Sequence, residues 1–125
     1  MDIEKIGRQV VDSAVKVHRE MGPGLLEKTY ETCLEYELHK RNIPTARQVE
    51  LPVVYDGFKL DGGYRIDLLV DQMIVIEIKA VRLLSEIHDA QLLNYLKLGD
   101  FRLGYLLNFN VRRMKFGIKR MVNNL

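Results

Sequence analysis

The stretch 64-YRIDLLVDQMIVIEIKAV-81 constrains the fold more than any other part of the chain. Two apolar runs flank a short polar turn, a pattern typical of two adjacent buried β-strands. Three charged residues, Asp67, Glu77 and Lys79, interrupt these runs. Burying an ionised side chain without a partner costs several kcal/mol, so the pairing of the strands must give these charges a suitable place.

The length of the turn decides which side chains meet, because a shift of one residue moves every side chain of a strand to the other face. A two-residue turn would place Asp67 opposite Ile76, on an apolar face without a partner for its charge. A three-residue turn over residues 71–73 places Asp67 opposite Glu77, with Lys79 on the same face. We therefore expect the three-residue turn. It leaves one uniformly apolar face, made of Tyr64, Ile66, Leu68, Val70, Ile74, Ile76, Ile78 and Ala80.

Two carboxylates side by side on neighbouring strands repel each other. A divalent cation would relieve this repulsion, and Mg²⁺ commonly binds through one or two carboxylates while keeping several waters. Lys79 could then stabilise charge on a phosphate or orient an attacking water. The alternative is an ordinary ion pair of Lys79 with Asp67 or Glu77 on a solvated sheet face.

The rest of the chain predicts a single domain over residues 1–125, of the α/β or α+β class. Gly22-Pro23-Gly24 ends the first helix, Asp56-Gly57 indicates a hairpin turn, and Ser85 is a suitable N-cap. The predicted order is α-α-β-β-β-α-β-β. Its elements are helices at 3–21, near 25–41 and 86–98, and strands at 49–55, in the two halves of 64–81, at 102–109 and around 114–118.

Some helical residues are candidates for the same site. On a helical wheel Glu27 falls on the core side of the second helix, although an acid in a first turn can simply favour the helix dipole. Gln91 and Tyr95 share one face of the third helix, with His88 one turn earlier, a combination that is also ordinary on a helix surface. For the core of this helix we expect Ile87, Ala90, Leu93 and Leu98.

Charge is unevenly distributed along the chain. Residues 1–96 carry a balance of −4 and residues 97–125 a balance of +6. A basic end indicates a polyanion partner or a solvated tail. Arg113, Lys115 and Lys119 alternate with apolar residues and are candidates for binding backbone phosphates.

The composition excludes several other classes. The single cysteine, Cys33, allows neither an intrachain disulfide nor a Cys-based zinc site and suits a reducing cytoplasm. Residues 1–13 lack the apolar region of a signal peptide, and no run approaches the length of a membrane span. We therefore expect a cytoplasmic location without membrane association.

Taken together, these residues resemble the PD-(D/E)XK nuclease superfamily, and within it the small proteins named for a GxxExxY motif. The resemblance extends from about Ile3 to Val122. Arg65-Ile66 precede Asp67, so the Pro of the superfamily name is absent. The matching positions are Gly24, Glu27 and Tyr30 as GxxExxY, Asp67, Glu77 and Lys79 as D…ExK, and His88, Gln91 and Tyr95 on the following helix.

The resemblance implies a restriction-endonuclease-like core, with a mixed central β-sheet flanked by helices. It also implies Mg²⁺, or Mn²⁺, bound by Asp67, Glu77 and the backbone carbonyl of Ile78, with Glu27 in the metal shell or acting as an acid or base. Lys79 would activate or position the attacking water. Orientation of the site or contact with nucleic acid would fall to Gln91, Tyr95, His88 and Tyr30.

These observations favour a Mg²⁺-dependent nuclease that hydrolyses phosphodiester bonds, with DNA favoured over RNA. A nucleic-acid-binding or assembly module that does not cleave, and a protein-interaction domain with a merely structural charged face, remain as alternatives. A chain of 125 residues has no room for a separate specificity domain, so sequence-specific cutting would need a homodimer or a protein partner.

Overall fold

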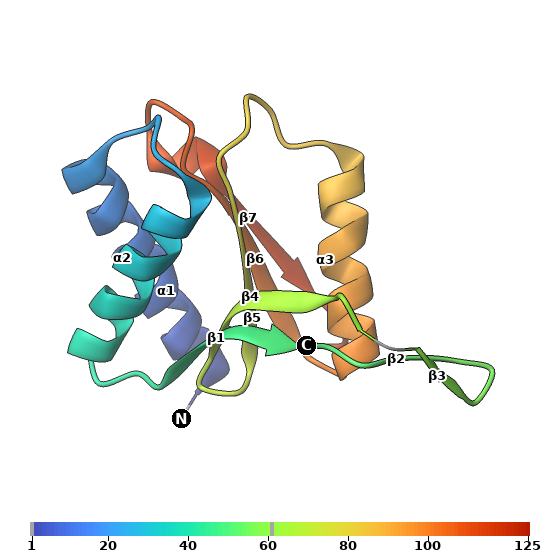
Figure 1. Cartoon of the computed structure of the whole chain (residues 1–125). Helices are drawn as coiled ribbons and strands as arrows, with labels where there is room; N and C mark the ends of the chain where they lie inside the picture. Colours follow the sequence, from blue (N-terminus) through green and yellow to red (C-terminus); the bar gives the residue numbers. More distant parts are fainter. Residues whose placement is uncertain (1, 61) are drawn as a thin grey trace.

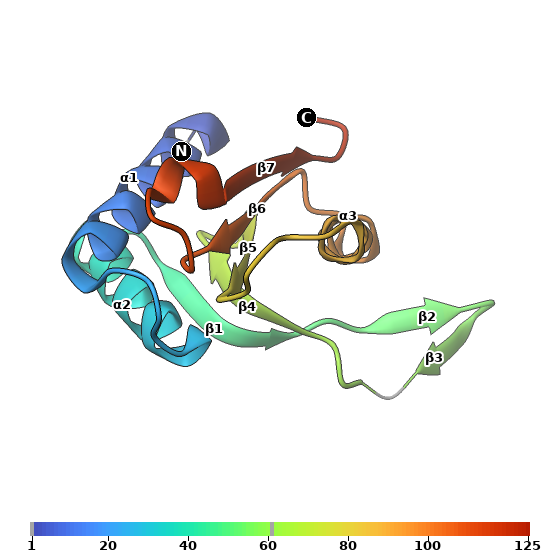
Figure 2. The same ribbon diagram turned by 90° about the horizontal axis from the view of Figure 1, so that it is seen from above.

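The computed structural model describes residues 2–60 and 62–125 and shows three layers (Figures 1 and 2). Helices α1 (Ile3–Met21) and α2 (Glu27–Lys40) cover one face of a central sheet, and α3 (Glu86–Gly99) covers the other. One hydrophobic core lies under α1 and α2 and a second under α3. None of the helices in the described residues is long and apolar enough to cross a membrane.

The central sheet has five strands in the order β1-β4-β5-β6-β7. Strands β5 and β6 run parallel and are connected through α3, whereas all other neighbours are antiparallel. The sheet is therefore mixed, as predicted. Its strands are β1 (Thr45–Glu50), β4 (Arg65–Val70), β5 (Ile74–Lys79), β6 (Leu103–Asn108) and β7 (Ile118–Val122).

The single strand predicted at 49–55 is wrong, because the chain leaves the central sheet after β1. Pro52 lacks the N–H that a continuing ladder would need. Residues beyond it form β2 (Val53–Tyr55), which pairs only with β3 (Phe58–Leu60) in a separate hairpin. The predicted turn at Asp56-Gly57 is confirmed, and both residues have positive φ (51° and 77°) as a tight hairpin turn requires.

The last predicted strand begins later than expected. Residues Met114–Gly117 form a short 3-10 helix, η1, which leads into β7. A side chain at Gly117 would collide with the main chain of Asn108, so the turn of η1 is packed tightly against the end of β6. Arg113 and Lys115 therefore do not share a strand face with Lys119.

The register between β4 and β5 confirms the three-residue turn. Val70 pairs with Ile74, and Leu68 pairs with Ile76. The turn over residues 71–73 brings the chain back with positive φ at Asp71 and Gln72. Asp67 is thus not opposite Ile76.

The prediction of one uniformly apolar face is only partly correct. Leu68, Val70 and the Ile residues of β5 lie under α1 and α2, but Ile66 packs on the α3 side with Leu92 and Leu96. Tyr64 is on the α3 side too, against Tyr95. The change of face coincides with Gln48, whose φ of 51° interrupts the pairing of β1 with β4.

The expected core face of α3 is also wrong. Leu92, Tyr95 and Leu96 are buried, whereas Ile87, Ala90 and Leu98 are exposed. Gly104 on β6 decides the orientation, because its lack of a side chain lets Leu92 and Leu96 approach the sheet closely.

Candidate active site

Asp67 and Glu77 lie where β4 and β5 diverge. The regular pairing ends at Leu68 and Ile76, and side chains take over the backbone hydrogen bonds beyond it. The N–H of Asp67 donates to Glu77 Oε2 at 2.9 Å, and the N–H of Ile78 donates to Asp67 Oδ2 at 2.8 Å. Each carboxylate is therefore fixed by the strand that carries the other one.

Each carboxylate keeps one oxygen largely free. Asp67 Oδ1 receives only a long contact of 3.5 Å from the amide of Gln48. Within the described residues, Glu77 Oε1 takes part in no hydrogen bond, and it is not among the fully buried oxygens that lack a partner. Two acidic oxygens are thus available to a ligand at one point of the sheet.

The surroundings make both negative charges unfavourable. Burial raises the pKa of Glu77 to about 8, and the charge of the neighbouring Asp67 adds to this shift. Burial also raises the pKa of Asp67, with a further contribution from Glu31, while the Ile78 N–H and Lys79 act in the opposite direction. A cation between the two groups would remove the repulsion and favour the ionised forms.

Lys79 is half-buried at the end of β5 and does not join the ion pairs found among the described residues. The alternative of a direct ion pair with Asp67 or Glu77 is therefore not supported. Its charge nevertheless lowers the pKa of both carboxyl groups, so the ammonium lies near them. The chain beyond it is held in place by Asn108, whose side chain bonds both the N–H and the carbonyl of Val81 (3.1 and 3.0 Å).

Glu27 is the first residue of α2 and is exposed, so the expectation of a core-side acid is wrong. The reason is its place in the first turn, next to the loop that follows β5. Its Oε2 accepts a hydrogen bond from the Ala80 N–H at 2.9 Å. Glu27 is thereby brought to the same end of β5 as Lys79.

Tyr30 holds the entry to α2. Its hydroxyl donates to the Gly22 carbonyl (2.5 Å) and accepts from the Leu25 N–H (3.1 Å), and its ring stacks on Phe109 at 4.4 Å. The side chain is fully buried, which excludes contact with nucleic acid. Tyr30 thus positions the loop that carries Glu27.

A small pocket of about 170 Å³ lies between residues of α2, β1, β4 and β5, and Asp67 and Glu27 both line it, whereas Glu77 and Lys79 do not. Because the Ile78 side chain is in the core, its main chain forms part of the wall. The lining residues are Glu27, Lys28, Glu31, Gln48, Asp67 and Ile78.

Sequence reasoning missed Glu31 and Gln48. Glu31 lies one turn after Glu27, and that i, i+4 spacing was the available signal. It is buried, accepts two hydrogen bonds from Arg47 (3.0 and 2.7 Å) and one from the Gln48 amide (2.7 Å). This network fixes Gln48 next to Asp67.

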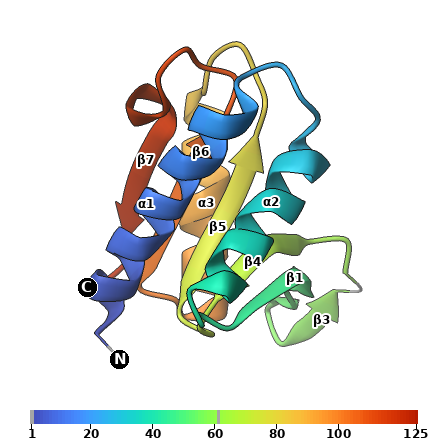
Figure 3. The same ribbon diagram turned by 90° about the vertical axis from the view of Figure 1, so that its left-hand side faces the viewer.

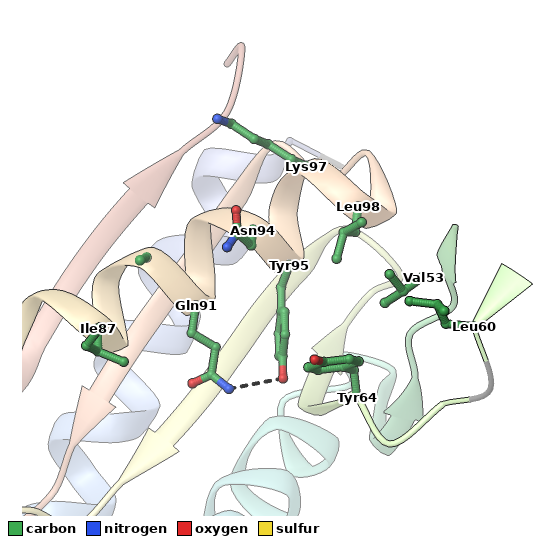
Figure 4. A pocket seen from close by; sticks show the side chains of 10 residues that line it. Val53, Leu60, Tyr64, Ile87, Gln91, Asn94, Tyr95, Lys97 and Leu98 are labelled. Carbon is green, nitrogen blue, oxygen red and sulfur yellow. Dashed lines mark hydrogen bonds between the residues drawn. The ribbon is translucent and has the colours of Figure 1, made fainter. Parts of the chain in front are cut away.

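Gln91 and Tyr95 share a face of α3, as predicted, and the Gln91 amide donates to the Tyr95 hydroxyl at 3.2 Å (Figure 4). Burial raises the pKa of Tyr95, and the charge of Glu77 adds to the effect, which places the phenol near that carboxylate. His88 has a different task, because its Nδ1 accepts from the Ser85 N–H at 3.0 Å and caps α3. Ser85 is thus confirmed as the N-cap.

The three predicted phosphate-binding residues are separated. Arg113 lines a cavity of about 440 Å³ with Arg112 and Phe116, and Lys115 lies over the Phe116 ring at 5.0 Å. The loop before η1 lies at the same end of the molecule as the loops after α1 and β5 (Figures 1 and 3). Lys119 is instead paired with Asp89 of α3 at 2.5 Å.

The donor set fits a cation that keeps much of its hydration. No group of three or more His, Cys, Asp or Glu side chains in residues 2–60 and 62–125 is arranged to hold a metal ion. Two carboxylates and a main-chain carbonyl are available instead, which suits Mg²⁺ because it retains several waters. Burial and neighbouring acids raise the pKa of both carboxyl groups, and a bound cation would lower it again.

The chain matches a family model described as the PD-(D/E)XK nuclease superfamily over residues 4–121. The chain belongs to this superfamily, since the match covers almost its whole length. Its mixed sheet between two helical layers is a restriction-endonuclease-like α/β core, as predicted. Comparisons with curated proteins and with solved structures gave no match.

Proposed function

We propose that the protein is a divalent-metal-dependent nuclease, formed as one domain over residues 1–125, that hydrolyses phosphodiester bonds and prefers DNA to RNA. The observation that carries this proposal is the pair Asp67 and Glu77, two adjacent acids with raised pKa values and one available oxygen each. Membership of the PD-(D/E)XK superfamily supports it.

Asp67, Glu77 and the main-chain carbonyl of Ile78 would hold Mg²⁺ or Mn²⁺. Bound there, the cation would supply activation of a water and neutralisation of the charge that develops on the phosphate. Lys79 would hold the attacking water or a phosphate oxygen with its free ammonium group. Glu27, fixed through Ala80, would accept a proton or a water of the metal shell.

The surrounding residues would bind the strand. Gln91 and Tyr95, joined by a hydrogen bond on α3, would contact the nucleic acid. Arg112, Arg113 and Lys115 are exposed and would hold backbone phosphates without reading the sequence, which gives salt-dependent binding. Lys119 is left out because Asp89 already neutralises it.

The test is incubation with single- and double-stranded DNA and RNA in Mg²⁺, in Mn²⁺ and with a chelator. Glu77→Gln and Lys79→Ala should each lower cleavage by about 100-fold or more with an unchanged circular dichroism spectrum. Glu20→Gln and Lys5→Ala, exposed positions on α1, are matched controls and should cleave like the wild type. Equal cleavage by all five proteins would indicate a contaminant and refute the proposal.

The second candidate is a nucleic-acid-binding module without turnover. It predicts binding that survives Glu77→Gln and the chelator, together with no cleavage in either metal. Among the described residues, no group of three or more His, Cys, Asp or Glu side chains is arranged to hold a metal ion, and a module of this kind would need none. Detection of metal-dependent cleavage would exclude it.

A further inference from the structure

An apolar groove runs along α3 beside the candidate active site (Figure 4). Its volume is about 690 Å³, within the range of about 300–1,000 Å³ typical of ligand pockets. One wall is the exposed side of α3, and the other is formed by the β2–β3 hairpin and by Tyr64, the residue before β4. The main lining residues are Leu60, Tyr64, Ile87, Gln91, Tyr95 and Leu98.

The groove combines aliphatic walls with a few polar groups and a free aromatic ring. The amides of Gln91 and Asn94 are its polar elements, whereas the ammonium of Lys97 points away from Tyr64 and Leu60 (Figure 4). Tyr64 meets Tyr95 at an angle of 81° and a distance of 6.3 Å, so the two rings do not stack on each other. Tyr64 is 48% exposed, which leaves ring surface available to a ligand.

Two residues of the groove, Tyr95 and Tyr64, relate it to the acidic pair, although the groove shares no lining residue with the small pocket at Asp67. Tyr95 lines it and also lies near Glu77, as described above. Tyr64 precedes Asp67 by three residues on an extended chain, a separation of about 10 Å. A nucleotide adjacent to a phosphodiester held by Asp67 and Glu77 would therefore reach the groove.

We propose that this groove binds an unpaired base of the strand being cut, which makes single-stranded nucleic acid the substrate class. The inference depends on the proposed function for the position of the phosphodiester. An unpaired base offers apolar faces for Tyr64 and the aliphatic walls, and hydrogen-bonding edges for the two amides. In a duplex the same faces are stacked and the edges are paired, so the groove could reach them only after unstacking.

The test measures binding by fluorescence anisotropy in the presence of a chelator, so that cleavage does not interfere. Three labelled probes of about 12 nucleotides are compared: a single strand, the same sequence as a duplex, and the same strand with abasic sites. The single strand should bind at least about tenfold tighter than the other two. Phosphate contacts are common to all three probes, so a purely electrostatic, salt-dependent attraction would not produce this difference in affinity.

Two variants remove groove contacts at exposed positions, where loss of folding is not expected. Tyr64→Ala and Ile87→Ser should each weaken single-strand binding by about fivefold or more. The matched controls are Tyr36→Ala on α2 and Leu83→Ser in the loop before α3, two exposed apolar side chains that do not line the groove. These controls should bind like the wild type.

Equal affinity for the abasic strand, or equal behaviour of groove and control variants, would overturn the inference. So would a sedimentation experiment in which the wild type is a dimer and Ile87→Ser is a monomer, since a second copy would then fill the groove. Base-dependent binding without any cleavage would refute the proposed function and leave the groove assignment standing. Cleavage without preference for unpaired strands would refute the groove assignment alone.

Discussion

Glu77 is a buried acid whose charge depends on what lies beside it. In the folded protein without metal its pKa is about 8, against 4.5 for the ordinary group, chiefly because of burial. The unfolded chain therefore loses this proton at lower pH than the folded chain. Between these two values the folded state binds more protons, so ionisation stabilises the unfolded state and stability falls as pH rises.

We therefore expect the melting temperature of the metal-free protein to fall between about pH 5 and pH 8, and the raised pKa of Asp67 adds to the trend. Glu77→Gln cannot ionise at this position and should show a clearly smaller decrease. Mg²⁺ or Mn²⁺ should raise the melting temperature more at the upper end of this range than at pH 5. Parallel pH profiles for wild type and Glu77→Gln, measured by thermal denaturation with a chelator, would contradict this account.

At the scale of the elements, the site exists because β4 is distorted between two regular halves. Gln48 of β1 has a φ of 51°, in the left-handed region that non-Gly residues seldom adopt. The strand pairing skips this residue, and Val49 and Ile66 continue on the α3 side while Arg47 and Leu68 face α2. The distortion turns Asp67 toward the small pocket that Glu27 and Glu31 also line.

The backbone conformation at Gln48 should reverse the usual preference of a strand for Val over Gly. Val is normally favoured over Gly in a strand, by up to about 1 kcal/mol. At Gln48 the positive φ penalises a β-branched residue, so Gln48→Val should be less stable than Gln48→Gly by about 1–2 kcal/mol. Both changes remove the same amide, and urea denaturation of the pair therefore isolates the backbone effect.

Glu50 provides the comparison within the same strand, since it is exposed and its φ is not positive. There Glu50→Val should be at least as stable as Glu50→Gly. The same order at both positions would show that the conformation of Gln48 carries no strain.

The pairing of the acids could be predicted from the sequence because strand side chains alternate strictly and buried charge is costly. That logic gave the turn over residues 71–73 and hence Asp67 next to Glu77. It assumed regular strands, so it missed the change of face that takes Ile66 to the α3 side. A left-handed backbone is usually signalled by Gly or Asn in the sequence, and position 48 is a Gln, so no residue type indicated it.

Contacts between elements account for the other differences. Glu31 joins the site only because α2 packs over β1, where Arg47 and Gln48 meet it. A helical wheel could not show which apolar face of α3 is buried. That face is set by Gly104 on β6, which leaves room for Leu92 and Leu96. The same packing leaves Ile87 and Leu98 at the surface, where they line the groove.

At the scale of the whole molecule, the β2–β3 hairpin is an arm that projects from the central body (Figures 1 and 2). Its two strands pair only with each other. Its base is narrow, because the Leu51 N–H donates to the Tyr64 carbonyl at 2.9 Å. The arm contributes Val53 and Leu60 to the groove but no strand to the central sheet.

This geometry allows the arm to be removed without disturbing the sheet. Leu51 and Tyr64 continue the antiparallel register of β1 and β4, so a two-residue Asn-Gly turn can replace residues 52–63. We expect the shortened protein to unfold cooperatively, with a melting temperature within about 5 °C of the wild type. Its affinity for a single strand should fall to that for the abasic strand, because one wall of the groove is gone.

The two measurements separate support of the fold from binding of the strand. An arm that stabilises the body would show itself in calorimetry as a large loss of melting temperature or of cooperativity. An arm that serves only recognition would leave the thermal transition in place and remove the preference for unpaired bases in the anisotropy assay. The second outcome is expected, since a two-stranded hairpin is at best marginally stable in water by itself. Its Tyr55 and Phe58 side chains are exposed, so they add little to the packing of the body.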